Sequence, residues 1–334
     1  MRIALDAMGG DRAPSVNIEG ALEAVLEWPD IEVILVGKED EIKDGLRGKK
    51  TERIEIVHAS EAIAMDDQLT TAIRKKKDSS IKRAVELVKN GKADAVLSAG
   101  HSGITMALAH LILGKAKGVE RPAIATLMPS LKENFLLLDA GANVDCTPKN
   151  LLEFALMADA YARLVMGRNN PKIALLSIGE EEVKGNELTK EAFKLLERAD
   201  INFVGNIEGR EIFKGDVDVV VCDGFVGNVV LKTSEGLAEA ALKMLRKEIT
   251  GRFLGKIGYM FLKTALKSFK KKTDYAEVGG APLLGINGAC IICHGRSSSK
   301  AIKNAIKMAS DFASKRVFEA ISSEIELNME RGIA

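Results

Sequence analysis

The stretch 216-DVDVVVCDGFVGNVVLKTSEG-236 decides the fold class of this chain. Its first part, 216–224, holds an apolar run that ends in an aspartate and a glycine, as expected of a strand buried on both faces. An amphipathic segment follows directly, and its pattern predicts a helix over residues 225–248. A strand that leads through a glycine turn into a helix is the unit from which parallel α/β sheets are built.

The same strand-then-helix pattern recurs along most of the 334 residues. It predicts an α/β fold with a mainly parallel sheet, right-handed crossovers and helices on both faces. No repeat or low-complexity linker interrupts it, so residues 1–334 are expected to form a single α/β catalytic unit, with 249–275 as an amphipathic helical protrusion. Further helices are expected over 79–90, 103–114, 148–166 and 186–198, and strands over 3–7, 31–37, 53–59, 93–100, 123–128, 134–141, 172–179 and 201–206.

The composition is that of a packed globular protein. Forty-eight Lys and Arg against 47 Asp and Glu give a net charge of +1, which argues against a nucleic-acid-binding protein. Four cysteines are too few for a disulfide scaffold and favour the reducing cytoplasm, and the N-terminal MRIALDAMGGD lacks the apolar core of a signal peptide. The longest uncharged run, 95–114, contains Ser, Gly, Thr and His, so we interpret it as strand, turn and helix rather than a membrane span.

Six loops rich in glycine and polar residues follow predicted strands. In parallel sheets ligands bind at the carboxyl ends of the strands, where glycine lets backbone amides approach closely and a helix N-terminus favours an anion. One such loop is more often only a turn, but six at one edge predict a binding site. The loops are 6–11, 98–103, 139–143, 179–186, 205–209 and 223–228.

Motifs typical of several other enzyme classes are missing from the sequence. There is no G-x-G-x-x-G dinucleotide motif, no G-x-x-x-x-G-K-[ST] phosphate loop and no G-x-S-x-G nucleophile elbow. Cys290 and Cys293 form a C-x-x-C pair without the second pair that a zinc site needs, and the isoleucines between them indicate a buried strand. We therefore expect structural cysteines, no metal and no cofactor.

Eight long segments resemble the bacterial phosphate acyltransferase family PlsX and together span nearly the whole chain. Two positions depart from the family pattern: Leu69 stands where the family usually has proline, and His101-Ser102 replaces the more usual Asn-Thr. The segments are ALDAMGGDRAP (4–14), SAG-x-x-G (98–103), GVERPA (118–123), LLDAGANV (137–144), IGEEEVKGNEL (178–188), FVGNIEG (203–209), VVVCDGFVGNVVLKTSEG (219–236) and YAEVGGAPLLGINGACIICHGRS (275–297).

The resemblance implies transfer of a fatty acyl group from acyl carrier protein to inorganic phosphate, giving acyl phosphate for phospholipid synthesis. It further implies a homodimer without cofactor and a fold similar to the isocitrate and isopropylmalate dehydrogenases and the phosphotransacetylases. It also implies a cytoplasmic protein peripherally associated with the inner face of the membrane, with a membrane glycerol-3-phosphate acyltransferase as a further partner.

In that reaction a phosphate oxygen attacks a thioester carbonyl and a thiolate leaves. Because phosphate is itself the nucleophile and a thiol has a pKa of only about 8.5, no nucleophilic side chain and little acid catalysis are needed. Positioning and oxyanion stabilisation should carry the catalysis. This chemistry favours cations, amide donors and glycine backbones at the strand ends.

The candidate catalytic residues are Lys184, Asn228, Asp223 and His294. Lys184 is expected to bind phosphate or stabilise the oxyanion, with a solvated ion pair as the alternative. Asn228 is expected to donate a hydrogen bond to the carbonyl, and Asp223 to orient Lys184 or Asn228. For His294, a structural hydrogen bond in a turn is an equal alternative.

A second group of candidates is expected to bind phosphate or substrate. Asp6, Gly9 and Gly10 are expected to shape one wall of the site, and Asn186 has helix capping as an equal alternative. The group consists of Asp6, Gly9, Gly10, Ser98, Ser102, Gly103, Asn186, Arg296 and Ser297.

Residues 252–272, RFLGKIGYMFLKTALKSFKKK, contain seven basic residues and no acidic one. On a helical wheel most of the basic side chains lie opposite the apolar ones, which is typical of a helix on an anionic membrane. A dimer-interface or carrier-docking helix is the alternative, and the basic run 74–77 is another candidate for docking the acidic carrier protein. The predicted membrane or partner contacts are Ile257, Phe261, Lys263 and Lys267.

Other functions stay open at this point. A phosphotransacetylase-like enzyme would use acyl-CoA in place of the acylated carrier protein. A dehydrogenase on the same scaffold would need a cofactor motif that the sequence lacks. A non-catalytic membrane-surface scaffold is favoured only by the basic stretch 252–272.

Overall fold

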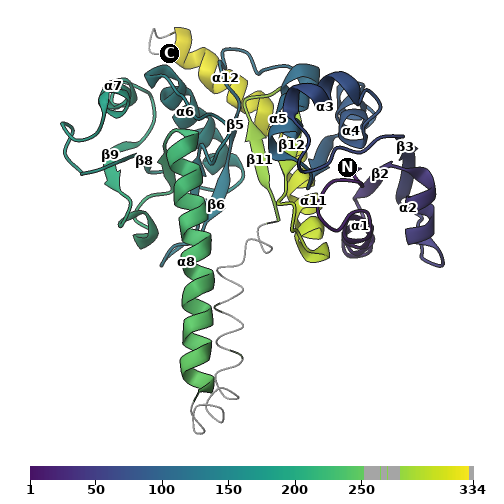
Figure 1. The fold of residues 1–334 in the computed structure, drawn as a ribbon. Helices are drawn as coiled ribbons and strands as arrows, with labels where there is room; N and C mark the ends of the chain where they lie inside the picture. Colours follow the sequence, from purple (N-terminus) through teal and green to yellow (C-terminus); the bar gives the residue numbers. More distant parts are fainter. Residues whose placement is uncertain (252–263, 265–268, 270–278, 331–334) are drawn as a thin grey trace.

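The computed structural model describes residues 1–251, 264, 269 and 279–330 (Figure 1). Ile257, Phe261, Lys263 and Lys267, and most of the predicted protrusion 249–275, lie outside the described residues. Their predicted membrane contacts therefore stay predictions.

The larger of two β-sheets has seven strands in the order β3-β2-β1-β4-β12-β11-β5. Its strands are parallel except for β11, which runs antiparallel to both β12 and β5. The strands are β1 (Arg2–Asp6), β2 (Glu32–Gly37), β3 (Ile54–His58), β4 (Ala95–Ser98), β5 (Ala123–Ile124), β11 (Ala281–Leu284) and β12 (Ala289–Ile292).

The smaller sheet has five strands in the order β6-β7-β10-β8-β9 and is parallel except for β6. Its central strands are buried along their whole length, as a sheet covered on both faces requires. The strands are β6 (Thr126–Met128), β7 (Phe135–Leu138), β8 (Ile173–Ser177), β9 (Phe203–Glu208) and β10 (Val219–Val221).

The α/β class with mainly parallel strands is confirmed, but the prediction of one sheet is wrong. The predicted strand 123–128 is in fact two strands, β5 in the larger sheet and β6 in the smaller one. Between them the backbone amide of buried Ala125 donates to the carbonyl of Pro282, 3.0 Å away, at the crossing point. The hydrophobic pattern of an apolar run does not distinguish a strand that stays in one sheet from a segment that crosses from one sheet to another.

Helices cover both sheets (Figure 1). Helix α6 is buried almost throughout because it packs against β7 and β10 on one side and against α7 and α12 on others. The helices are α1 (Ser15–Glu27), α2 (Glu39–Leu46), α3 (Leu69–Lys75), α4 (Ser80–Lys89), α5 (Ser102–Leu113), α6 (Pro148–Leu164), α7 (Glu187–Leu196), α8 (Gly224–Thr250), α11 (Ser299–Ser314) and α12 (Val317–Glu330), with a 3₁₀ turn at Ile212–Lys214.

Helix α8 starts beside the smaller sheet and extends well beyond the rest of the described chain (Figure 1). Its far half exposes large apolar side chains, among them Met244 at 68% exposure. Within the described ranges, no helix has both the length and the apolar character to cross a membrane.

Candidate active site

A cleft of about 720 Å³ lies where the two sheets meet, beside the first half of α8. Strands β5 and β6 contribute to its walls, together with α8 and the residues that flank β11 and β12. Polar side chains, including Ser102, Asn228, Lys232, Glu235 and His294, line part of it. The rest is mostly apolar and includes Leu127, Met128, Leu131, Phe213, Leu231, Leu237, Ala238 and Ala241.

The first turn of α8 places Asn228 in this cleft. Asp223 caps the helix, because its Oδ1 accepts the backbone amide of Val226 at 2.9 Å. The helix then lies so close to the loop after β7 that a Cβ on Gly227 would be 1.9 Å from the carbonyl oxygen of Asp139, so this position requires glycine. Asn228 is exposed in the cleft beside Gly141. The predicted contact of Asp223 with Lys184 or Asn228 stays a prediction.

The loop after β7 is organised by Asp139, a fully buried residue that our list of candidates omitted. Its Oδ1 accepts the backbone amides of Ile124, Gly141 and Ala142 at 3.0–3.1 Å. Its Oδ2 accepts the backbone amide of Asn143 at 2.7 Å and that residue's side-chain amide at 2.9 Å. Burial raises the pKa of Asp139, and these hydrogen bonds oppose the rise. The signal in the sequence was an aspartate directly after an apolar strand.

His294 lines the cleft from the turn after β12. Its Nδ1 accepts the backbone amide of Arg296 at 3.1 Å, so the neutral ring carries its proton on Nε2. Burial lowers the pKa of His294, Lys232 and Arg296 lower it further, and Glu235 and Asp11 oppose the shift without reversing it. His294 is therefore a neutral donor at neutral pH, and the predicted structural bond in a turn is present as well.

Ser102 reaches the cleft from the first turn of α5. The N-cap of this helix is His101, whose Nδ1 accepts the backbone amide of Ile104 at 3.4 Å. Gly103 follows in the same turn and packs against the His101 ring. The pair His101-Ser102, which departs from the family pattern, thus starts a helix whose first residue, the predicted substrate-binding Ser102, lines the cleft.

Asp6 and Ser98 lie beneath the surface at the ends of β1 and β4. Ser98 Oγ donates to Asp6 Oδ2 at 2.7 Å and accepts the backbone amide of Gly100 at 3.0 Å. A Cβ on Gly9 would be only 2.6 Å from Asp6 Oδ2, so glycine allows the loop to close over this pair. Both side chains are almost fully buried, so they shape the loops instead of facing solvent.

The loop with Gly9 and Gly10 meets the turn after β12. A Cβ on Gly10 would lie 3.1 Å from the carbonyl oxygen of Gly295. Arg296, the next residue, is highly exposed and lies 3.9 Å from Asp11. Ser297 is buried, and its Oγ has no hydrogen-bond partner among the described residues. Helix α11 begins two residues later, so Ser297 lies directly before Ser298, the N-cap of this helix.

Lys184 and Asn186 belong to the exposed loop after β8 and are not part of the described lining of the cleft. Asn186 Oδ1 accepts the backbone amide of Thr189 at 2.9 Å, so Asn186 is the N-cap of α7, as its alternative interpretation held. Lys184 packs its side-chain carbons over Gly179. Its predicted role in catalysis stays a prediction.

The basic run 74–77 lies at the end of α3, which packs against α5. Arg74, Lys75 and Lys77 are exposed, whereas Lys76 forms an ion pair with Asp67 at 2.5 Å.

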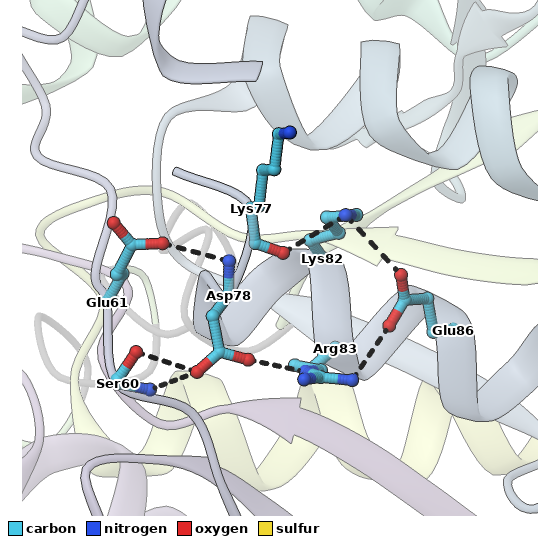
Figure 2. A network of polar contacts seen from close by, with 7 residues as sticks. All are labelled: Ser60, Glu61, Lys77, Asp78, Lys82, Arg83 and Glu86. Atoms are coloured by element: carbon cyan, nitrogen blue, oxygen red, sulfur yellow. Dashed lines mark hydrogen bonds and ion pairs between the residues drawn. The ribbon is translucent and has the colours of Figure 1, made fainter. Parts of the chain in front are cut away.

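The residues after this run are held by a polar network (Figure 2). Asp78 accepts hydrogen bonds from the backbone and hydroxyl of Ser60 and from Arg83, which hold its pKa well below the usual range. Lys82 donates to the carbonyl of Lys77 at 3.0 Å, while the Lys77 side chain points away from the network (Figure 2).

Cys290 and Cys293 are buried free thiols in and directly after β12, and burial raises the pKa of both. In the described part of the chain, no group of three or more His, Cys, Asp or Glu side chains is arranged to hold a metal ion.

Comparisons with known proteins identify relatives over the whole chain. A family model described as "Fatty acid synthesis protein" matches residues 1–320. A phosphate acyltransferase from Thermodesulfovibrio yellowstonii is 60% identical over 333 residues, which cover 99% of this chain and 96% of that protein. A phosphate acyltransferase from Geotalea uraniireducens is 54% identical, with 98% and 95% covered.

Solved structures with the same fold are more distant in sequence. A phosphotransacetylase from Streptococcus pyogenes superposes with a TM-score of 0.65 at 21% identity, over 96% of this chain and 94% of that one. A 4-hydroxythreonine-4-phosphate dehydrogenase from Klebsiella pneumoniae gives a TM-score of 0.54 at 14% identity, over 94% and 99%. The expected likeness to phosphotransacetylases and to a dehydrogenase scaffold is therefore confirmed for the fold.

Proposed function

This chain belongs to the phosphate acyltransferase family of fatty acid and phospholipid synthesis, and we propose that it transfers a fatty acyl group from acyl carrier protein to inorganic phosphate in the cleft beside α8. One observation carries the choice of site: a polar end and an apolar groove adjoin in a single cleft. Phosphate and an acyl chain differ so much in polarity that one site must offer both surfaces.

In the reaction, an oxygen of hydrogen phosphate attacks the thioester carbonyl carbon. The tetrahedral oxyanion collapses, the carbon–sulfur bond breaks, and acyl phosphate and a thiolate form. The proton from phosphate ends on the thiolate, directly or through water. Because a thiol has a pKa of about 8.5, the leaving group departs without a strong acid catalyst.

The residues of the polar end divide this work between them. Asn228 Nδ2 donates to the carbonyl oxygen, where negative charge develops in the transition state. His294 lines the same polar end of the cleft, so its uncharged ring lies beside the reacting groups. The amino end of α5, with Ser102 and the amide of Gly103, binds the phosphate.

The acyl donor is the acidic carrier protein, docked on the exposed cations Arg74, Lys75 and Lys77. Their position supports this choice, since α3 packs on the helix whose first turn lines the cleft. The protein works as a homodimer in the cytoplasm, and the basic stretch 252–272 binds an anionic membrane surface near a glycerol-3-phosphate acyltransferase.

The proposed reaction is tested by mixing the purified chain with inorganic phosphate and palmitoyl carrier protein. Free carrier thiol and acyl phosphate should appear in equal amounts, and only when phosphate is present. Palmitoyl-CoA is the second donor: turnover with CoA alone would make the chain a phosphotransacetylase-like enzyme. Absence of phosphate-dependent release from both donors would contradict the proposal.

Asn228→Ala tests the placement of the site. Loss of an oxyanion donor should lower kcat by about 100-fold to 1,000-fold. Lys184→Ala should lower kcat at least about 100-fold if Lys184 also contacts the oxyanion. Normal kcat in Asn228→Ala together with a large loss in Lys184→Ala would move the site from the cleft to the loop after β8.

A further inference from the structure

The cleft has a gradient of polarity along α8. Its first part is mostly polar, with Asn228, Lys232, Ser234 and Glu235 beside Leu231. Its second part is apolar and consists of Leu237, Ala238 and Ala241. The charges in the first part neutralise each other, because Lys232 Nζ lies 3.0 Å from Glu235 Oε2. A ligand with a polar head at Asn228 and an apolar tail toward Ala241 matches this gradient.

The length of this stripe is set by helix geometry. Asn228 and Ala241 are thirteen positions apart, and a rise of 1.5 Å per residue makes the groove about 20 Å long. A carbon–carbon bond of about 1.5 Å advances an extended chain by somewhat less than its length, so the stripe matches a chain of about sixteen carbons. The segment from β6 onward lines the cleft with the apolar Leu127, Met128, Pro129 and Leu131, and with the polar Thr126, Ser130 and Asn134.

The far positions of the stripe are both small. Ala238 is half-buried and Ala241 is exposed, so the groove opens toward solvent at its outer end. A larger side chain at either position would occupy the space that the tail of a long chain needs. The size of the side chains at these two positions therefore limits the length of the acyl chain that fits in the groove.

We propose that the groove along α8 binds the acyl chain and that Ala238 and Ala241 set the longest chain that the enzyme accepts. This inference rests on the proposed function, since it places the acyl carbonyl at Asn228. A second copy of this chain is the other occupant that an exposed apolar groove could have, and the experiment separates the two.

The test compares Ala238→Phe, Ala241→Phe and the control Ala240→Phe, whose side chain is on α8 but outside the lining of the cleft. Hexanoyl, decanoyl and palmitoyl thioesters of the same carrier protein serve as donors. Each methylene displaced from the groove costs roughly fourfold in binding. Ala238→Phe should lower the ratio of palmitoyl to hexanoyl kcat/KM at least about tenfold, Ala241→Phe about fourfold, and Ala240→Phe not at all.

A uniform loss at all chain lengths would overturn the inference. So would a change of oligomeric state in Ala238→Phe, measured by light scattering, because the groove would then be an interface between copies. Calorimetry with palmitic acid separates this inference from the reaction. The wild-type chain could bind palmitic acid without turnover while Ala238→Phe does not bind it. That result would contradict the proposed function and support acyl-chain binding in the groove. If neither protein binds palmitic acid, acyl-chain binding in the groove is contradicted.

Discussion

Asp6 and Asp139 are buried aspartates at the carboxyl ends of β1 and β7, one in each sheet, and they use their oxygen atoms differently. Asp6 accepts the hydroxyl of Ser98 on the neighbouring strand and the backbone amide of Met8. Burial raises the pKa of Asp6, and hydrogen bonds from Ser80, Ser98 and the amides of Met8 and Gly9 oppose the rise. Asp139 accepts four backbone amides and one side-chain amide, nearly all from its own loop. Each has a glycine packed closely against it, Gly9 or Gly227.

The two carboxylates therefore stabilise different parts of the structure. Asp6 ties the ends of two strands together, so its loss leaves a local gap. Asp139 organises a whole loop, and the start of α8 rests on that loop. The position of Asn228 in the cleft therefore depends on Asp139 far more than on Asp6. Neither aspartate needs to contact substrate to matter for activity.

The largest decrease in the free energy of unfolding is expected from Asp139→Ala. A harmless substitution would contradict the difference between Asp139 and Asp6. The substitution leaves the amides of Ile124, Gly141 and Ala142, together with both donors of Asn143, without their acceptor. A buried donor without a partner costs about 1–3 kcal/mol, so the loss should reach several kcal/mol. Urea unfolding measures it, with Asp139→Asn as the conservative control. A loss below about 1 kcal/mol would show that the loop holds itself.

A smaller loss is expected from Ser98→Ala, which tests the Asp6 side of the comparison. The variant removes one donor to a carboxylate and the acceptor of Gly100, for a loss of about 2 kcal/mol in the free energy of unfolding. Ser177→Ala at the end of β8 is the matched control, since Ser177 makes a single long hydrogen bond. Equal stability of Ser98→Ala and Ser177→Ala would mean that the Asp6–Ser98 bond contributes nothing net.

The smallest change in stability is expected at Glu153 in α6. This third buried carboxyl accepts fewer hydrogen bonds than Asp6 or Asp139. Its Oε2 accepts the backbone amide of Glu120 at 2.8 Å, while its Oε1 has no partner among the described residues. With so few donors, burial raises the pKa of Glu153 to about 7. Between pH 4.5 and pH 7, Glu153 is ionised in the unfolded chain but still protonated in the folded one. Stability from the protonated carboxyl is therefore present below pH 4.5 and lost as the pH rises through 7.

Glu153→Gln should remove this pH dependence, because glutamine keeps an acceptor for Glu120 and has no charge. At pH 8 the variant should be more stable than the wild type by about 1–2 kcal/mol, with no gain near pH 4. Thermal unfolding at both values measures the difference. A gain that is the same at pH 4 and pH 8 would rule out titration of Glu153 as the cause.

The fold was predictable wherever burial on both faces produced a long apolar run. The five predicted helices agree with α4 to α8 within two residues at each end. Helices α1 and α11 were not predicted, since each is stabilised by packing on the other, with Gly20 of α1 directly against Ile302 of α11. Such mutual support is a tertiary property that local periodicity does not carry.

The site was predictable in part for the same reason. Asn228, His294 and Ser102 follow strands whose ends meet, and the structure brings them together in the cleft. Lys184 also follows a strand, but β8 lies next to the outer strand of the smaller sheet, and its loop is exposed away from the described lining. The order of strands across a sheet, which decides which loops become neighbours, cannot be read from the loops themselves.

The seating of α8 also has a mechanical consequence. There is no room for even one added carbon at Gly227, so the start of α8 is in direct contact with the loop after β7. From Asn228 to Thr250 it is a stiff rod of about 33 Å, with one end clamped. A surface that contacts the far end of α8, at Thr250, is therefore held at a fixed distance and angle from the cleft.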